Sequence, residues 1–174
     1  MSSNGPSRGN PAIGDILRSV GLIALIILAL WGFGKLFTNT PDSPVKAVDY
    51  ASTVSSARPA ADFELLAPRS LPAGWKATSA RFNPRSWHLG VLTADDDYIG
   101  LEQVKLTVPR AVDRFARGSK SAGTATIGAE TWSVRKGPDD DITYVRQEAG
   151  LTTLVNGTAP QRVVEAYVAS LSAS

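Results

Sequence analysis

The sequence predicts an α+β fold, in which an antiparallel β-sheet domain with a C-terminal helix packed on one face is preceded by one N-terminal transmembrane helix. Three observations support this prediction. An uncharged apolar run separates Arg18 from Lys35, short segments with two-residue alternation follow Ala60, and the last part of the chain has a helical period. We therefore expect a tail, a membrane span, a linker and one outer domain.

The apolar run is long enough to cross a bilayer if Arg18 and Lys35 extend toward the headgroups, which gives a span over residues 16–37. At about 1.5 Å per residue, a helix of roughly 20 residues crosses the roughly 30 Å of hydrocarbon with its backbone groups paired internally. A cleaved signal peptide is the main alternative, but no Ala-x-Ala site follows the run. A buried core helix would normally keep a polar face, which this run lacks.

We expect the run to act as a signal anchor in the plasma membrane, with the N-terminus cytoplasmic and the C-terminal domain outside. Residues 1–15 are rich in Ser, Asn, Gly and Pro and predict a disordered cytoplasmic tail. Residues 38–60 predict a linker and a juxtamembrane helix that Ser43-Pro44 begins. Residues 61–174 then form the extracytoplasmic α+β domain.

The outer domain contains short strand patterns separated by turn residues. The expected strands are 63–66, 75–82, 87–93, 98–108, 123–127, 130–135, 142–148 and 151–155. A short helix is expected over 110–117, with Gly118 as its C-terminal stop. Thr158 and Gln161 have the spacing of a capping box, and the apolar face that runs from Val163 to Leu171 predicts a helix docked on the sheet.

One pattern occurs twice within the domain. Trp87 precedes three aspartates and Gln103, and Trp132 precedes three aspartates and Gln147 at nearly equal spacings. Either these are two similar hairpins, or they descend from an old duplication of one unit.

The charge balance argues against a nucleic-acid partner. The chain has 174 residues and a formal net charge of +2, with 18 basic and 16 acidic residues. Arg8, Arg18 and Lys35 lie in the tail and anchor together with Asp15, so the outer domain is formally neutral and the excess charge belongs to the membrane topology. Because the chain has no cysteine, it has no disulfide, thiol nucleophile or thiolate metal site.

The sequence identifies no catalytic, cofactor or metal residues. The runs 95–97 and 139–141 are triple aspartates, which could bind a hard cation but are more typical of solvated turns. His88 is the only histidine, and no G-x-S-x-G elbow is present to place a catalytic serine. We therefore expect His88 to be a polar residue on the outward face of a strand, and we expect the protein not to be an enzyme.

A basic stripe is the one candidate binding surface. Arg110, Arg114 and Arg117 recur at helical spacing, and Lys120 follows them. Outside a cell such a stripe could contact anionic lipid headgroups or anionic envelope polymers. The alternative is a solvated helix face without a partner.

Several motifs resemble those of an uncharacterised family of actinobacterial membrane proteins, domain of unknown function 4245. Besides the anchor, the segments that carry the resemblance are Val48-Asp49-Tyr50, Ala67-Pro68, Leu71-Pro72-Ala73-Gly74-Trp75, Gly128-Ala129-Glu130-Thr131-Trp132 and Asn156-Gly157-Thr158. The resemblance implies a single-pass membrane protein of unassigned function and supplies no catalytic residues. More weakly, the chain is similar to extracytoplasmic domains of anti-sigma-type regulators and lipoprotein carriers, which implies sensing or ligand holding by analogy.

The leading interpretation is a non-enzymatic domain that binds a partner or ligand at the cell envelope. Its expected partners are the bilayer, through the anchor, and an envelope protein or anionic polymer. One alternative is a carrier of a lipid or other hydrophobic ligand, which requires an apolar cavity between sheet and helix. A second alternative is an envelope hydrolase, which requires a concave site containing His88 or clustered acids.

Overall fold

The computed structural model describes Arg18, residues 20–30 and residues 46–173. The chain divides into two compact units, Met1–Pro44 and Val45–Ser174, and each is considered by itself. In the first unit residues 20–30 are helical. Every residue of this segment is exposed, including the Leu, Ile and Val residues. Among the residues described, no helix is long and apolar enough to cross a membrane. The rest of the predicted span, the predicted tail and the predicted helix start at Ser43-Pro44 lie outside the described residues.

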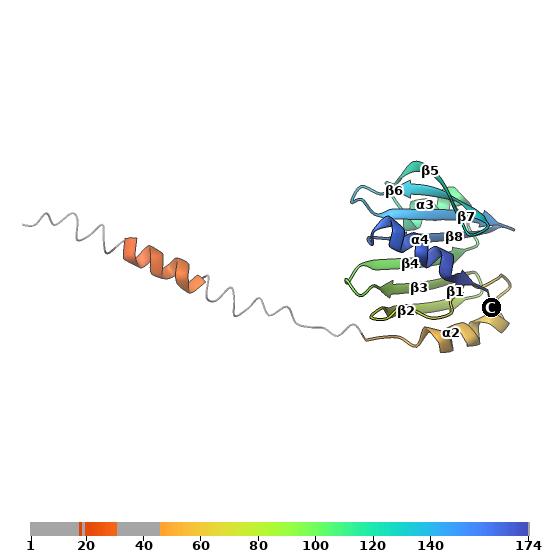
Figure 1. Ribbon diagram of the computed structural model, residues 1–174, viewed down its shortest axis with the longest axis horizontal. Coiled ribbons are helices and arrows are strands. Elements are labelled where there is room, and N and C mark those ends of the chain that lie inside the picture. Colours follow the sequence, from red (N-terminus) through yellow and green to blue (C-terminus); the bar gives the residue numbers. More distant parts are fainter. Residues whose placement is uncertain (1–17, 19, 31–45, 174) are drawn as a thin grey trace, which may run out of the picture. The chain divides into compact units, whose positions relative to one another are not determined.

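The second unit is built on a seven-stranded antiparallel sheet (Figure 1). Its strands, in spatial order, are β2 (Lys76–Asn83), β3 (Ser86–Leu92), β4 (Tyr98–Val104), β8 (Leu151–Gly157), β7 (Ile142–Glu148), β6 (Glu130–Lys136) and β5 (Lys120–Ile127). The two meanders β2–β3–β4 and β5–β6–β7 therefore meet at β8. A second, two-stranded sheet pairs β1 (Ala67–Pro68) with β9 (Leu171–Ser172).

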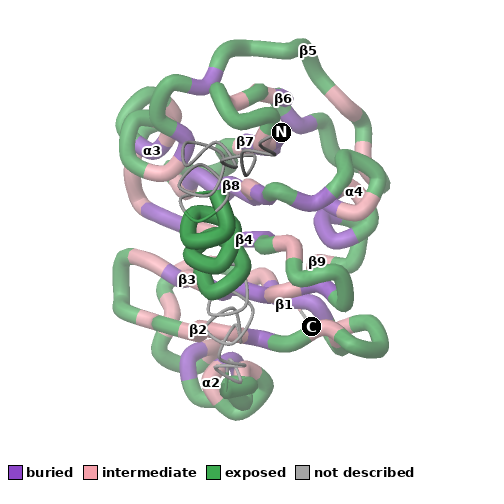
Figure 2. The backbone as a smooth tube through the Cα atoms, turned by 90° about the vertical axis from the view of Figure 1, so that its left-hand side faces the viewer, coloured by how far each residue is buried: buried purple, intermediate pink, exposed green. Residues whose placement is uncertain are grey.

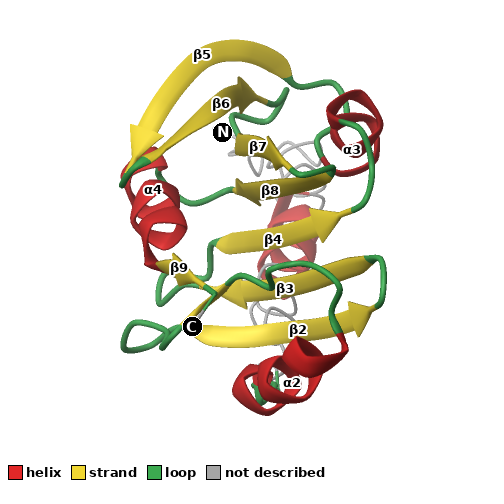
Figure 3. Cartoon of the chain, turned by 90° about the vertical axis from the view of Figure 1, so that its right-hand side faces the viewer, coloured by secondary structure: helices red, strands yellow, loops and turns green. Residues whose placement is uncertain are grey.

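Helices lie on both faces of the sheet and along one edge (Figure 3). Helix α4 (Gln161–Ser170) packs on one face and α3 (Val108–Phe115) on the other. Helix α2 (Tyr50–Ala57), followed by the 3₁₀ turn η1 (Arg58–Ala60), lies against edge strand β2, where the Val48 N–H donates to the Ala77 carbonyl at 2.8 Å. The α+β class and the C-terminal helix are thus confirmed.

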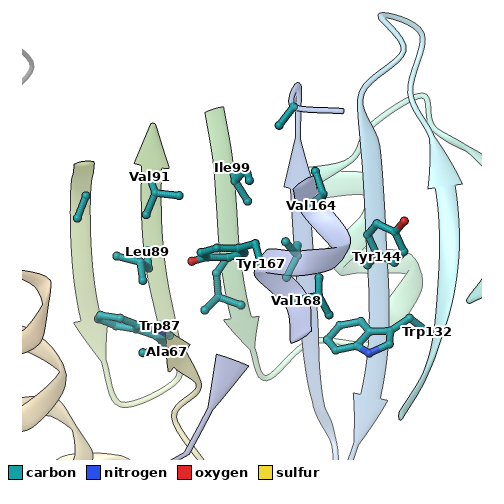
Figure 4. Close-up of a cluster of buried hydrophobic side chains, with 14 of the residues drawn as sticks. Ala67, Trp87, Leu89, Val91, Ile99, Trp132, Tyr144, Val164, Tyr167 and Val168 are labelled. Carbon is teal, nitrogen blue, oxygen red and sulfur yellow. The ribbon is translucent and has the colours of Figure 1, made fainter. Parts of the chain in front are cut away.

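The main core lies between α4 and the sheet. Trp87, Leu89 and Tyr144 are completely buried there, with Val164 and Tyr167 of α4 packed over them (Figure 4). The Tyr167 ring also stacks on Trp75 at a centroid distance of 6.1 Å. The second core is smaller and joins α3 to Val104, Val145 and Leu154, whose side chains point to the opposite face. Because both faces of the sheet are covered, burial is nearly continuous along much of the central strands β4, β7 and β8 (Figure 2).

Several predicted boundaries are wrong for local reasons. Helix α2 begins at Tyr50, because the Asp49 carboxylate accepts the Ser52 N–H at 3.1 Å and caps it there. Residues 63–66 form no strand; the only pairing nearby is β1. Strand β4 ends at Val104, because the chain bends before the proline-containing first turn of α3.

The predicted capping box at Thr158 is also wrong. Helix α4 begins at Gln161 with Pro160 in the cap position, and the Thr158 hydroxyl instead accepts the Tyr98 N–H at 3.0 Å. A tertiary contact has replaced the local one. After Ser170 the chain leaves the helix to form β9, so the helix is shorter than predicted.

The repeated tryptophan–aspartate pattern corresponds to two similar hairpins. Because the two meanders cross the sheet in opposite directions toward β8, a duplicated unit would place equivalent side chains on opposite faces. Trp87 and Trp132 instead belong to the same core, on the α4 face. Gln103 is buried whereas Gln147 is exposed, so these two residues are not equivalent either.

Candidate ligand pocket and basic face

A pocket of about 260 Å³ lies on the α4 face of the sheet, between the segment 62–66 and the strands β4, β7 and β8. It is lined by Asp62, Phe63, Glu64, Leu66, Gln103, Lys105, Arg146, Glu148, Ala149, Leu151 and Thr153. Sequence reasoning missed this site, because its lining comes from four separate parts of the chain.

A buried glutamine holds one wall of the pocket in place. Gln103 is only 1% exposed; its Oε1 accepts the Leu66 N–H at 2.8 Å, and its Nε2 donates to the Glu64 carbonyl at 3.0 Å. Trp87 adds a third bond, from its indole N–H to the Leu66 carbonyl at 3.0 Å. These bonds satisfy the backbone of a segment that belongs to no sheet. They also fix Phe63 at the pocket.

Arg146 brings a partly buried guanidinium to the pocket. Its guanidinium lies over the Trp132 ring, 5.5 Å from the centroid, and pairs with the carboxylates of Glu130 and, at 3.1 Å, Glu148. Its side chain is only 20% exposed, so solvent screens these interactions incompletely.

The pocket rim is slightly acidic. Lys105 donates to Asp62 at 2.5 Å, and this bond lowers the pKa of the exposed Asp62 carboxyl. The lining contains the carboxylates of Asp62, Glu64 and Glu148 against the cations of Lys105 and Arg146. Phe63, Leu66 and Leu151 add apolar surface to these charges. Such a lining suits an occupant with a small apolar body and a polar or basic end.

The predicted basic stripe is partly assembled. Arg110 and Arg114 are exposed on α3, and Arg117 is exposed in the turn that follows the end of the helix at Phe115. Arg117 pairs with Asp113 at 3.6 Å, and Arg114 lies over the Phe115 ring, 5.2 Å from its centroid.

Lys120 does not continue the stripe. It is the Cα partner of Lys136 in β6, and Lys136 is in turn the partner of Ile142, a core residue on the α4 face. Directly paired residues point to the same side of a sheet, so Lys120 faces away from the arginines of α3.

The triple-aspartate runs form turns at the same end of the sheet. Asp96 and Asp140 adopt left-handed φ angles of 62° and 60°, which aspartate tolerates better than most residues. Among the described residues, no group of three or more histidines or acids is placed to hold a metal ion.

His88 lies on the face of the sheet that carries α3, opposite the main core. Its Nδ1 is 2.5 Å from Glu102 Oε1 and its Nε2 is 2.7 Å from Ser79 Oγ, so it bridges side chains of β4 and β2. None of the four described pockets includes His88.

The interface between α4 and the sheet is filled. Val164, Tyr167 and Val168 are at most 5% exposed and contact the core strands directly (Figure 4). None of the four described pockets lies beneath this helix. This packing counts against an internal cavity for a hydrophobic ligand.

The comparisons with known proteins give one match. A family model described as "Protein of unknown function (DUF4245)" matches residues 8–171, which is nearly the whole chain. No curated protein and no solved structure matches the chain.

Proposed function

The chain belongs to the DUF4245 family, whose function is unknown, and we propose that it is a single-pass membrane protein whose C-terminal domain binds a partner at the cell envelope. The observation that carries the proposal is the pocket beside the segment 62–66, with its mixed polar and apolar lining. We propose that the occupant is an apolar side chain with a neighbouring basic group, presented by an envelope protein. Phe63 and Leu66 would contact its apolar part, and Glu64 and Glu148 would attract its charge.

The anchor is proposed from the apolar run, of which residues 20–30 are helical and expose their large apolar side chains. In water this exposure is unfavourable, whereas lipid would cover such a surface. The filled interface under α4 makes the hydrophobic-carrier alternative the weaker one.

The topology is tested by placing a single cysteine in the cysteine-free chain. Ala129 suits this purpose because it lies in an exposed turn, whereas Ser119 is buried and accepts a bond from Arg135. We expect a membrane-impermeant maleimide to label Ala129→Cys in intact cells. Labelling that appears only after lysis would place the domain in the cytoplasm and contradict the proposed orientation.

Binding at the pocket is tested with a benzophenone amino acid at Ala149, which is exposed and lines the pocket. We expect irradiation of intact cells to give one discrete adduct of the full-length chain. The adduct should disappear with Thr153→Leu, which adds bulk to the lining of the pocket. As a control, the same probe placed at the exposed Thr126 of β5, outside the pocket lining, should give no adduct. An adduct that persists with Thr153→Leu, or no adduct at all, would contradict the proposal.

A second candidate contact is the arginine face of α3 with anionic headgroups. Each basic residue near such a surface contributes about 1 kcal/mol, so Arg110→Ala with Arg114→Ala should weaken binding to phosphatidylglycerol vesicles by about tenfold or more. The residue 45–174 unit, which contains both cores, is suitable for this assay. Lys120→Ala is the control, since Lys120 faces the other way. Binding that survives high salt, or that is equally strong to neutral vesicles, would contradict this contact.

A further inference from the structure

We infer that Ser79 is a reactive nucleophile for acyl transfer from small esters, activated by His88 as general base and positioned by Glu102. This chemistry goes beyond the binding function proposed above. The three residues come from adjacent strands β2, β3 and β4, and we call them the relay. Ser79 Oγ lies 2.7 Å from His88 Nε2, and His88 Nδ1 lies 2.5 Å from Glu102 Oε1.

The proton positions follow from the acceptor chemistry. An ionised carboxylate only accepts hydrogen bonds, so Nδ1 of His88 must carry a proton toward Glu102. In the neutral ring, Nε2 then has a free lone pair and accepts the Ser79 hydroxyl proton. This is the order of roles in a nucleophile–base–carboxylate triad, which is recognised by geometry rather than by sequence position.

The sheet holds the relay rigidly. His88 and Glu102 are direct Cα partners across β3 and β4. The Cα partner of His88 in β2 is Arg81, and Ser79 lies two ladder positions farther along, opposite Gly90. The side chains of His88 and Glu102 are 20% and 14% exposed. Partial burial strengthens their hydrogen bond, and both side chains keep some contact with solvent.

A hydrogen-bond donor faces the same space. A Cβ at Gly90 would lie 2.7 Å from Ser79 Oγ and 2.8 Å from Tyr98 Oη, so these oxygens flank the surface above a residue that has no side chain. A Cβ at Gly100, the Cα partner of Gly90, would lie 2.7 Å from Asn156 Oδ1 and 3.1 Å from Tyr98 Oη. Burial, and then the Glu102 carboxylate, raise the pKa of Tyr98, so its hydroxyl stays protonated and can donate to a developing oxyanion.

The proposed reaction is ester hydrolysis through an acyl-serine, and water is its only co-reactant. Ser79 Oγ bonds to the ester carbonyl carbon as its proton passes to His88 Nε2. The bond between that carbon and the alcohol oxygen then breaks, and the leaving alcohol takes the proton. Water attacks the acyl-serine with His88 as base, which releases the acid and returns the proton to Ser79. Because the side chains of His88 and Glu102 are only 20% and 14% exposed, the substrate class is small or terminal esters, such as acetyl esters.

The first test treats the full-length chain in detergent with p-nitrophenyl acetate and locates any acetyl group by peptide mass spectrometry. We expect acetyl-Ser79, lost with Ser79→Ala and slowed by about 10²–10⁴-fold with His88→Gln. Glu102→Gln should slow the reaction, and Glu102→Asp should restore part of it. The control is Ser133→Ala, an exposed strand serine in β6, which should change nothing. The inference would be overturned if Ser79 carried no acetyl group, or if the chain as a whole were acetylated as fast with Ser79→Ala as without it.

The second test does not depend on ester chemistry. Since the chain has no cysteine, Ser79→Cys introduces the only thiol. A thiol beside an imidazole ionises more readily, so near neutral pH it should react with iodoacetamide about tenfold faster than the thiol of Ser133→Cys. Replacing His88 with Gln in the Ser79→Cys chain should remove the difference. Equal rates at the two positions would show that His88 does not activate position 79.

Discussion

Trp87→Ala should lower the free energy of unfolding of the residue 45–174 unit by about 3–5 kcal/mol, the largest loss expected from a single substitution in this unit. Trp87 is completely buried in the core beneath α4, and its truncation would leave a large cavity. It would also remove the indole N–H that donates to the Leu66 carbonyl at 3.0 Å, leaving that acceptor without this bond. The substitution therefore affects the core and the pocket wall together.

The measurement is urea denaturation of the residue 45–174 unit, followed by circular dichroism. The matched control is Trp75→Ala, because Trp75 is only partly buried and stacks on Tyr167 at the margin of the same core. The control should cost clearly less than Trp87→Ala. A loss at Trp87 no larger than the loss at Trp75 would show that the core relaxes around the missing indole.

The parts of the fold that were predictable are those with local causes. The face from Val163 to Leu171 predicted α4 because a helical period is a property of consecutive residues. The start of α4 was not predictable from the same stretch, because the Thr158 hydroxyl bonds to Tyr98, 60 residues away. The insertion of β8 between β4 and β7 is likewise a non-local pairing, which alternation within a strand does not specify.

The same distinction explains the sites. Helical spacing predicted the arginine face of α3, but placing Lys120 required the register of β5 against β6. His88 was correctly expected on the outward face of a strand, yet its partners Ser79 and Glu102 depend on which strands are neighbours. The only sequence signal was a serine and a glutamate in segments on either side of the single histidine. That signal is far too common to identify a relay.

Gln103→Leu should cost about 2–4 kcal/mol of unfolding free energy even though leucine nearly fills the same space. The substitution removes both bonds to the segment 62–66, so the Leu66 N–H and the Glu64 carbonyl lose their side-chain partner. Each polar group left unpaired in a buried site costs about 1–3 kcal/mol. If the segment 62–66 detaches, water can solvate its backbone and the loss of unfolding free energy becomes smaller. Detachment of the segment would also open one wall of the pocket.

Hydrogen exchange shows whether the segment 62–66 detaches in Gln103→Leu or stays in place with its polar groups unpaired. If the segment detaches, the Leu66 amide should exchange much faster in Gln103→Leu while amides of β7 and β8 stay protected. Gln147→Leu is the control, because Gln147 is exposed and its Nε2 donates to the Leu106 carbonyl at 3.4 Å and the Thr152 hydroxyl at 3.2 Å, not to the segment 62–66. It should change stability by less than about 1 kcal/mol and leave Leu66 protected. An equal effect of the two substitutions would contradict the assignment of Gln103 as the residue that holds the pocket wall.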